Sequence, residues 1–295
     1  MLILPRSGGV RDDGVGSMIR DAEKGTLRDD RIRLSDVSEV NMISSITVKP
    51  KLRLKNLLDQ NEVALATFAT LPGSRAAQAV IIDQEHGHIG DTEMHDMVVA
   101  VSGSGVSPIV RIAGLSGILI KRALDTGAHG IMVPSVNTAE EARSAVSWAK
   151  FPPVGVRGQG SPFACFEHGW ATPSEYVANA NEGLITMIQI ETKGGVENID
   201  EICEVDGVDL LFIGPNDLAL ALLGYTPAKY TETCFLEAID KVVESAHKHG
   251  KKVGILVVDG EAAKKAKERF DMVLISNDVR SLQAWYSREL KLARS

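Results

Sequence analysis

The chain has 295 residues, of which 44% are hydrophobic and 24% charged, with a formal net charge of −7 and an isoelectric point of about 5.6. This balance gives no electrostatic case for nucleic-acid or anionic-membrane partners, and no apolar run approaches the roughly 18 residues that span a bilayer. The three cysteines form no CxxC pair, which is typical of a reducing compartment, so we expect a cytoplasmic protein.

The first segment of the chain, residues 1–47, differs in composition from the rest. It mixes charges of both signs with glycine and contains no aromatic residue. Such a segment has too little apolar surface to form a core, so we predict a disordered extension. Its acidic residues argue against a mitochondrial targeting peptide. Residues 48–295 are predicted to form a single catalytic domain.

Eight apolar runs typical of β-strands follow, most of them separated by amphipathic segments such as 138–150, 194–205 and 231–250. The runs are 63–69, 79–83, 107–112, 130–134, 185–191, 209–214, 252–258 and 272–276. Strands rich in Val, Ile and Leu between helices indicate a parallel sheet that is covered on both faces. Eight such units in about 245 residues predict an α/β protein with a (β/α)8 TIM barrel. A doubly wound open sheet is the alternative.

Two connections depart from this regular pattern. Only the segment TLPGSRAAQ separates the first two strands, whereas a parallel crossover usually needs about a dozen residues, so we predict a shortened first βα unit. Residues 150–184 instead form a long connection that is rich in Pro and Gly and ends in a short helix near Pro173. Long loops in compact domains are often functional.

Acidic side chains stand at the carboxyl ends of the predicted strands, where TIM-barrel enzymes carry their catalytic groups. The fifth strand ends at Glu191, and the sixth leads into Asp217. Mg²⁺ commonly takes one or two carboxylates and keeps positions for water and substrate oxygens. Glu191 and Asp217 are therefore the predicted metal ligands. Each acid could instead be a cap or first-turn residue of a helix, which the sequence leaves open.

The second and third predicted strands end in further polar groups. The second leads into DQEHGH, which contains Asp83, Glu85 and His86, and the third ends near Arg111. The guanidinium of Arg111 can bind a carboxylate or an enolate oxygen, or it can form a structural ion pair with Asp83. His86 can act as a general base near neutral pH with Asp83 orienting its ring, or it can be hydrogen-bonded in a turn.

Several motifs together resemble the HpcH/HpaI family of metal-dependent class II aldolases. They are IIDQEHG, PIVRI, KRALDTGAHGIMVPSVNTAEEARSAVSWAKFPPVGVRGQGS, MIQIET and GVDLLFIGPNDLA, and the match runs from about Lys51 to the C-terminus. The resemblance implies a (β/α)8 barrel that assembles as a homo-oligomer, either dimer-based or a hexamer, with its last helix exchanged between neighbours.

The resemblance also implies how a substrate is held. Glu191 and Asp217 would ligate Mg²⁺, with Mn²⁺ or Co²⁺ as alternatives, and a small 2-oxo acid such as pyruvate would share that ion. Backbone N–H groups around Gly214 and Asn216 would hold the substrate carboxylate at the N-terminus of a helix.

Five further positions receive roles from the same resemblance. Arg111 would stabilise the enolate oxygen, while His86, braced by Asp83, would serve as the base. Gln189 would support Glu191 from the same strand and help to bind substrate. Asp125, in the LDxG segment, would reach the rim of a neighbouring subunit.

The activity implied by the family is the cleavage of 4-hydroxy-2-oxo acids through a pyruvate enolate. The same site would decarboxylate oxaloacetate, because that reaction yields the same enolate. Residues 91–112 and 121–134 are most similar to a fungal member that forms carbon–carbon bonds, so a bond-forming enzyme of secondary metabolism is one alternative. A catalytically inactive subunit descended from the aldolases is the other.

Overall fold

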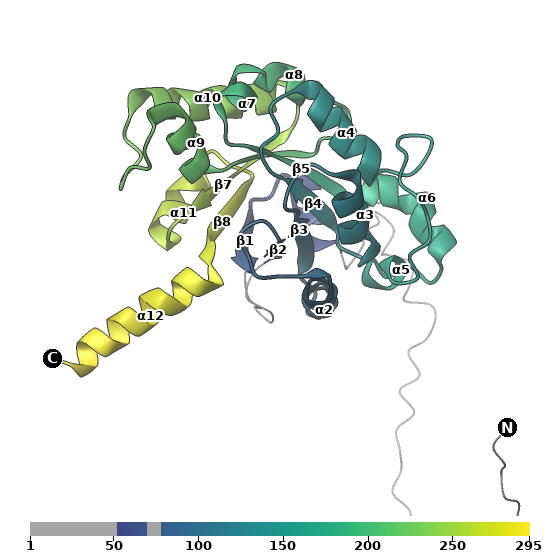
Figure 1. Ribbon diagram of the computed structural model, residues 1–295, viewed down its shortest axis with the longest axis horizontal. Helices are drawn as coiled ribbons and strands as arrows, with labels where there is room; N and C mark the ends of the chain where they lie inside the picture. Colours follow the sequence, from purple (N-terminus) through teal and green to yellow (C-terminus); the bar gives the residue numbers. More distant parts are fainter. Residues whose placement is uncertain (1–51, 70–77) are drawn as a thin grey trace, which may run out of the picture. The chain divides into compact units, whose positions relative to one another are not determined.

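The structure, a computed structural model, describes residues 52–69 and 78–295, and these form a closed barrel of eight parallel strands in chain order (Figure 1). The strands are β1 Ala64–Ala69, β2 Ala79–Asp83, β3 Ser107–Arg111, β4 Gly130–Val133, β5 Ile185–Ile190, β6 Leu210–Ile213, β7 Lys252–Val257 and β8 Met272–Asn277. Parallel pairing of β1 with β8 closes the ring. This confirms the predicted (β/α)8 barrel and excludes the open sheet.

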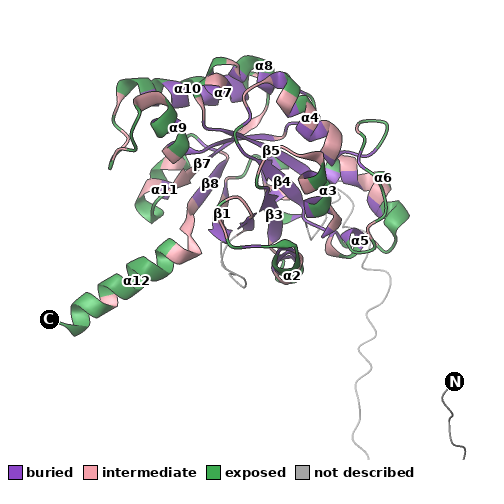
Figure 2. Ribbon diagram, viewed as in Figure 1, coloured by how far each residue is buried: buried purple, intermediate pink, exposed green. Residues whose placement is uncertain are grey.

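The strands read as continuous apolar runs because both of their faces are covered. Every residue of β2 to β6 is buried (Figure 2). Within β2, Ile81 belongs to the cluster that also holds Phe68 and Phe212, whereas Val80 and Ile82 belong to the cluster shared with the helices. Alternate residues therefore fill the inside of the barrel and the layer beneath the helices, as a packed barrel requires.

Twelve helices lie in the described ranges. They are α1 Arg53–Asp59, α2 Asp91–Ser102, α3 Gly117–Asp125, α4 Ala139–Ala149, α5 Ala164–Glu167, α6 Pro173–Gly183, α7 Lys193–Glu197, α8 Ile199–Cys203, α9 Pro215–Leu223, α10 Thr233–Lys248, α11 Gly260–Ala266 and α12 Asp278–Ala293. None of them combines the length and apolar content that crossing a bilayer requires. α12 has no buried residue and projects away from the barrel (Figures 1 and 2).

The helix expected over 194–205 is instead two short helices, α7 and α8. They meet at Asn198, which is both the C-terminal cap of α7 and the N-terminal cap of α8. The side-chain Nδ2 of Asn198 donates to the carbonyl oxygen of Asn137, 2.8 Å away, in the loop after β4. A tertiary hydrogen bond thus accompanies the break in the helix. The local sequence does not indicate this bond.

Two predictions fall on parts of the chain outside the described residues. These are the extension over 1–47 and the interior of the shortened first unit, residues 70–77. On either side of that unit, β1 and β2 pair in parallel with Ala66 opposite Ala79. The long connection after α4 contains α5 and then α6, which begins at Pro173 as expected and is capped by Thr172.

Candidate active site

The carboxyl ends of β2, β3, β5 and β6 bring the predicted site residues to one end of the barrel. Asp83 ends β2 and Arg111 ends β3, and the two are partners in the strand register. Glu191 follows β5 directly, while Asp217 lies in the first turn of α9, which begins just after β6. Because parallel strands of a barrel end on the same rim, these groups share that rim.

Arg111 is held rigidly by acids on its own side of the rim. Its Nε lies 2.9 Å from Oδ1 of Asp83, its Nη2 lies 2.5 Å from Oδ2, and its Nη1 lies 3.1 Å from Oε2 of Glu85. The guanidinium carbon is 4.4 Å from the centre of the Phe68 ring. The ion pair with Asp83, left open by the sequence, is therefore present. This bidentate pair fixes the orientation of the Arg111 guanidinium.

His86 occupies an exposed position, with 60% of its side chain accessible. Its backbone N–H donates to Oδ1 of Asp83 over 3.3 Å, whereas its ring Nε2 lies 3.7 Å from Oε2 of Glu85. Glu85, rather than Asp83, is thus the acid beside the ring, because the Asp83 carboxylate pairs with Arg111 and caps the turn. Burial raises the pKa of Glu85, and the charge of Arg111 opposes that rise.

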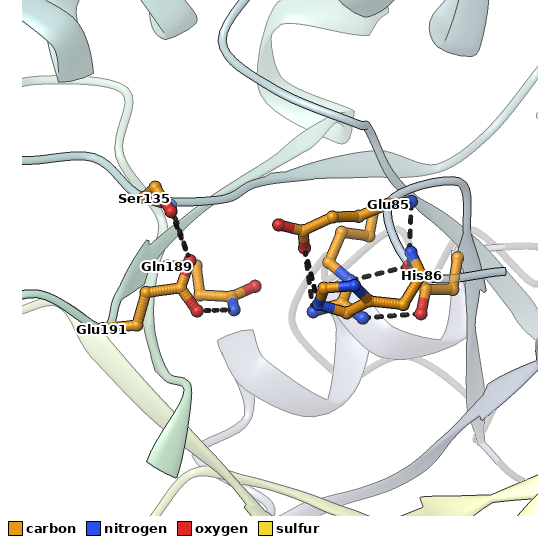
Figure 3. Close-up of polar contacts among 7 residues, drawn as sticks. Glu85, His86, Ser135, Gln189 and Glu191 are labelled. Carbon is orange, nitrogen blue, oxygen red and sulfur yellow. Dashed lines mark hydrogen bonds and ion pairs between the residues drawn. The ribbon is translucent and has the colours of Figure 1, made fainter. Parts of the chain in front are cut away.

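Glu191 is a buried carboxylate with polar partners on both of its oxygens. The side chain is 3% exposed, and Oε1 accepts hydrogen bonds from the backbone N–H and the hydroxyl of Ser135, each at 2.8 Å (Figure 3). Oε2 accepts a hydrogen bond from Nε2 of Gln189. Burial raises the pKa of Glu191, the bonds from Ser135 and Gln189 lower it, and the charge of Asp217 raises it further. A cation would therefore stabilise an ionised Glu191 beside Asp217.

Gly214 is required by the close approach of Glu191 and Gln189. A Cβ at this position would lie 2.5 Å from Oε2 of Glu191 and 2.9 Å from Nε2 of Gln189. α9 begins at the next residue, Pro215, which has no N–H, and the N–H of Gly214 donates to the carbonyl oxygen of Ile190, so the N–H groups at the start of the helix are those of Asn216 and Asp217. Asn216, in the first turn, accepts a hydrogen bond from the hydroxyl of Tyr230 over 2.6 Å. A helix N-terminus of this kind favours an anion such as a carboxylate.

The donor groups near Glu191 fit a hard divalent cation. Within the described ranges, no three His, Cys, Asp or Glu side chains gather as a metal cluster, so the protein would supply the two carboxylates alone. Mg²⁺ accepts such a set and completes its shell with water or substrate oxygens. Oε1 of Gln189 is buried without a hydrogen-bond partner among the described residues, and Figure 3 shows this amide oxygen on the side facing Glu85 and His86. A buried acceptor without a partner is rare in folded proteins, and a bound ligand or water would satisfy it.

Asp125 does not join this group of residues. It is the last residue of α3, shortly before β4 begins, and therefore lies towards the end of the barrel opposite the rim. Its carboxylate pairs with Lys121 and with Nη2 of Arg157, the latter at 3.0 Å. Any contribution of Asp125 to catalysis would have to be made in the site of another subunit.

Three residues that contact the site were not assigned a role from the sequence. Ser135 contacts Glu191, whereas Glu85 and Phe68 both contact Arg111. Ser135 and Glu85 each lie two residues after the last residue of a strand, so their position relative to the strand ends was the available signal.

Comparison with known proteins gives a consistent result. The model of the HpcH/HpaI aldolase/citrate lyase family matches residues 64–280. A hydroxypyruvate/pyruvate aldolase from Rhizorhabdus wittichii is 37% identical over 242 residues, which cover 79% of this chain and 94% of that protein. The solved HpcH/HpaI aldolase from Desulfitobacterium hafniense has a TM-score of 0.76 and 31% identity, over 82% of this chain and 96% of its own. Macrophomate synthase has a TM-score of 0.70 and 25% identity, over 83% and 88%, and is one structural relative among several.

Proposed function

The chain belongs to the HpcH/HpaI aldolase/citrate lyase family of carbon–carbon lyases, and we propose that it is a divalent-metal-dependent aldolase that cleaves 4-hydroxy-2-oxo acids through a pyruvate enolate. The observation that carries this proposal is the pairing of two features on one rim. Glu191, buried and close to the charge of Asp217, suits a cation, and Arg111 is fixed nearby by Asp83. A cation and a guanidinium on one rim suit a 2-oxo acid whose enolate carries negative charge.

The metal-binding part of the proposal rests on Glu191 and Asp217, which would hold Mg²⁺, with Mn²⁺ or Co²⁺ as alternatives. When bound, the ion would act as a Lewis acid towards the keto oxygen of the substrate. Of the positions around Gly214 and Asn216, the N–H groups of Asn216 and Asp217 would bind the substrate carboxylate, as helix N-termini bind anions. The N–H of Gly214 donates to the carbonyl oxygen of Ile190, and Pro215 has none. The orphan oxygen of Gln189 would accept a hydrogen bond from the bound substrate or from water.

The proton transfers are assigned to the side of the rim that carries Arg111 and His86. His86, which is exposed, would take the proton of the 4-hydroxyl group directly or through a water molecule. As that proton leaves, the C3–C4 bond breaks, an aldehyde is released, and the electron pair becomes the enolate of pyruvate. Arg111 would stabilise the negative charge on the enolate oxygen, and Asp83 keeps the guanidinium in place. Protonation at C3 then gives pyruvate. Loss of CO₂ from oxaloacetate would reach the same enolate.

Assembly into a homo-oligomer is part of the proposal, as either a dimer-based form or a hexamer. α12 projects from the barrel with several large apolar side chains exposed. They are Leu282, Trp285, Tyr286, Leu290 and Leu292. An apolar helix face of this extent is typical of a surface that packs against another chain. In such an assembly, Asp125 is proposed to reach the site of a neighbouring subunit.

The proposed activity predicts pyruvate release from a panel of 4-hydroxy-2-oxo acids. We expect release from at least one member of the panel and from oxaloacetate, with both reactions abolished by EDTA and restored by Mg²⁺ or Mn²⁺. Coupled oxidation of NADH by lactate dehydrogenase measures the pyruvate. Release that is insensitive to chelator would contradict the metal dependence, and no release with any substrate would favour a catalytically inactive subunit.

A bond-forming synthase is the second candidate, supported by the structural similarity to macrophomate synthase. Such an enzyme would also consume oxaloacetate, but the enolate would be added to a second substrate. Mass spectrometry of the products separates the two candidates, because an adduct would replace free pyruvate.

Gly214→Ala is expected to impair the proposed site without unfolding the barrel. The new methyl group would collide with Oε2 of Glu191, which cannot move away freely because Ser135 and Gln189 hold the carboxylate. A displacement of about 1 Å at a catalytic group can cost on the order of 100-fold in rate. We therefore expect a loss of about that size in metal-dependent pyruvate release, with a far-UV circular dichroism spectrum like that of the wild type. Gly160→Ala is the control, because a Cβ there meets no atom of the described residues within 4 Å.

A further inference from the structure

Ser135 makes an unusual double contact with Glu191. Its backbone N–H and its side-chain hydroxyl donate to the same oxygen, Oε1, and both distances are 2.8 Å (Figure 3). Ser135 comes from the loop after β4, whereas Glu191 follows β5, the neighbouring strand in the barrel. The contact therefore ties the proposed metal ligand to a second, independent part of the rim.

The backbone at Ser135 adopts a conformation that residues with a Cβ seldom adopt. Its φ angle is +54°, in the left-handed region, which makes it one of three non-glycine residues with positive φ in the described ranges. Strained backbone of this kind persists where the surrounding contacts enforce it, and it occurs most often at functional sites. Here the left-handed turn accompanies a geometry in which the N–H and the hydroxyl meet one acceptor.

Hydrogen bonds on the far side of the loop hold this conformation in place. The carbonyl oxygen of Ser135 accepts from Nδ2 of Asn137 over 2.8 Å. Oδ1 of Asn137 in turn accepts from the hydroxyl of Thr192, the residue after Glu191. Nδ2 of Asn198 donates to the carbonyl oxygen of Asn137. The loop is thus fastened to the segment that carries Glu191 by contacts on both sides of the carboxylate.

These contacts leave the Glu191 carboxylate with little rotational freedom. Two donors from Ser135 fix Oε1, and Nε2 of Gln189 fixes Oε2. Removing a partner that orients a metal ligand in this way typically costs about 10–100-fold in metal affinity. The hydroxyl of Ser135 is not part of the β4–β5 strand pairing, which is complete at Val133 opposite Ile188. Its contact with Glu191 thus serves the carboxylate and adds nothing to the barrel ladder.

We propose that Ser135 is a positioning residue of the divalent-metal site, which holds Glu191 in its ligating orientation before the ion arrives. This inference rests on the proposed metal-dependent function and assigns one further residue to it. Ser135 acts through Glu191 and does not itself contact the substrate.

The test measures Mn²⁺ binding to the full chain by isothermal titration calorimetry, without substrate. For Ser135→Ala, which removes the hydroxyl and keeps the N–H, we expect a dissociation constant raised about 10-fold or more. Ser135→Gly removes the same hydroxyl but accommodates the left-handed backbone, so it should show the same loss. If Ser135→Ala does not fold, the glycine variant carries the test. Ser104→Ala is the matched control, because that hydroxyl is exposed and donates to the carbonyl oxygen of Ala100, in the last turn of α2.

Two further readouts separate positioning from a general structural effect. The metal-free melting temperature of a folded Ser135 variant should stay close to that of the wild type, and turnover at saturating Mn²⁺ should largely recover. A wild-type chain that binds Mn²⁺ and a Ser135→Ala variant that binds it equally well would overturn the inference and leave the proposed function intact. A wild-type chain that binds no Mn²⁺ would instead overturn the metal-dependent function.

Discussion

Replacing Glu191 with glutamine is expected to abolish metal-dependent pyruvate release while leaving the barrel folded. Glutamine keeps the shape of the side chain but removes the charge that would bind the ion. A bound metal typically supplies several kcal/mol of charge stabilisation, so the loss should be on the order of 1,000-fold or more. Steady-state kinetics with and without EDTA measures it. Full chelator-sensitive activity in the variant would show that Glu191 is not a metal ligand.

The same substitution is also expected to affect the stability of the folded chain, and the direction of the effect follows from the pKa of Glu191. Burial raises the pKa of Glu191 in the folded chain, so the stability associated with its neutral form is present at low pH and is lost as the pH rises through the raised pKa. The glutamine variant stays neutral. Without metal at neutral pH, it should therefore melt at or above the wild-type temperature. Adding Mg²⁺ should raise the melting temperature of the wild type alone.

Asp217→Asn is the matched comparison for Glu191→Gln. Asp217 is exposed in the first turn of α9, so its neutralisation should bring no comparable gain in metal-free stability. It should nevertheless remove the metal-induced increase in melting temperature. A variant of Asp217 that retains this increase would leave Glu191 without its proposed partner.

Replacing Arg111 with alanine is expected to eliminate oxaloacetate decarboxylation and also to destabilise the barrel. Asp83 is 2% exposed, and among the described residues its carboxylate would keep only the backbone N–H donors of Glu85 and His86 once the guanidinium is removed. Removing one partner of a buried ion pair typically costs about 3–5 kcal/mol. Chemical denaturation measures that loss, and the lactate dehydrogenase assay measures the activity.

A double variant separates the two roles of Arg111. In Asp83→Asn/Arg111→Ala, the buried charge is gone, so much of the lost stability should return. Activity should stay absent, because no guanidinium remains to stabilise the enolate oxygen. Unchanged kinetics in the single variant would remove Arg111 from the proposed mechanism. Restored activity in the double variant would show that the single variant had failed through instability alone.

The strands were predictable because each is a short apolar run between longer helical segments. β2 is found at the predicted residues, and the other seven strands differ from the prediction by one residue at one end or at each end. A barrel strand is buried on both faces, which makes it a strong signal in sequence. The split of 194–205 into α7 and α8 was not predictable, since the break at Asn198 coincides with a hydrogen bond to a loop some sixty residues earlier.

The site was predictable only where side chains stand on or next to strands. Asp83, Arg111 and Glu191 follow directly from the strand ends. The acid beside the His86 ring could not be predicted in this way, because the conformation of a turn decides whether Asp83 or Glu85 faces the ring. The position of Ser135 two residues after a strand end was its only sequence signal, and its φ of +54° and its contact with Glu191 could not be read from that spacing. The roles assigned to these residues in binding and proton transfer stay predictions.

The residues named for chemistry occupy one arc of the barrel, from β2 round to β6. In the described ranges, the ends of β7 and β8 contribute none of them, and Val258, just after β7, is 66% exposed. We therefore expect that substitutions along this second arc can change which carbonyl compound is accepted as the reaction partner, while the groups proposed to hold pyruvate stay in place. Enzymes with this arrangement would differ in the carbonyl compounds that they accept, while the residues proposed to bind the 2-oxo acid stay the same.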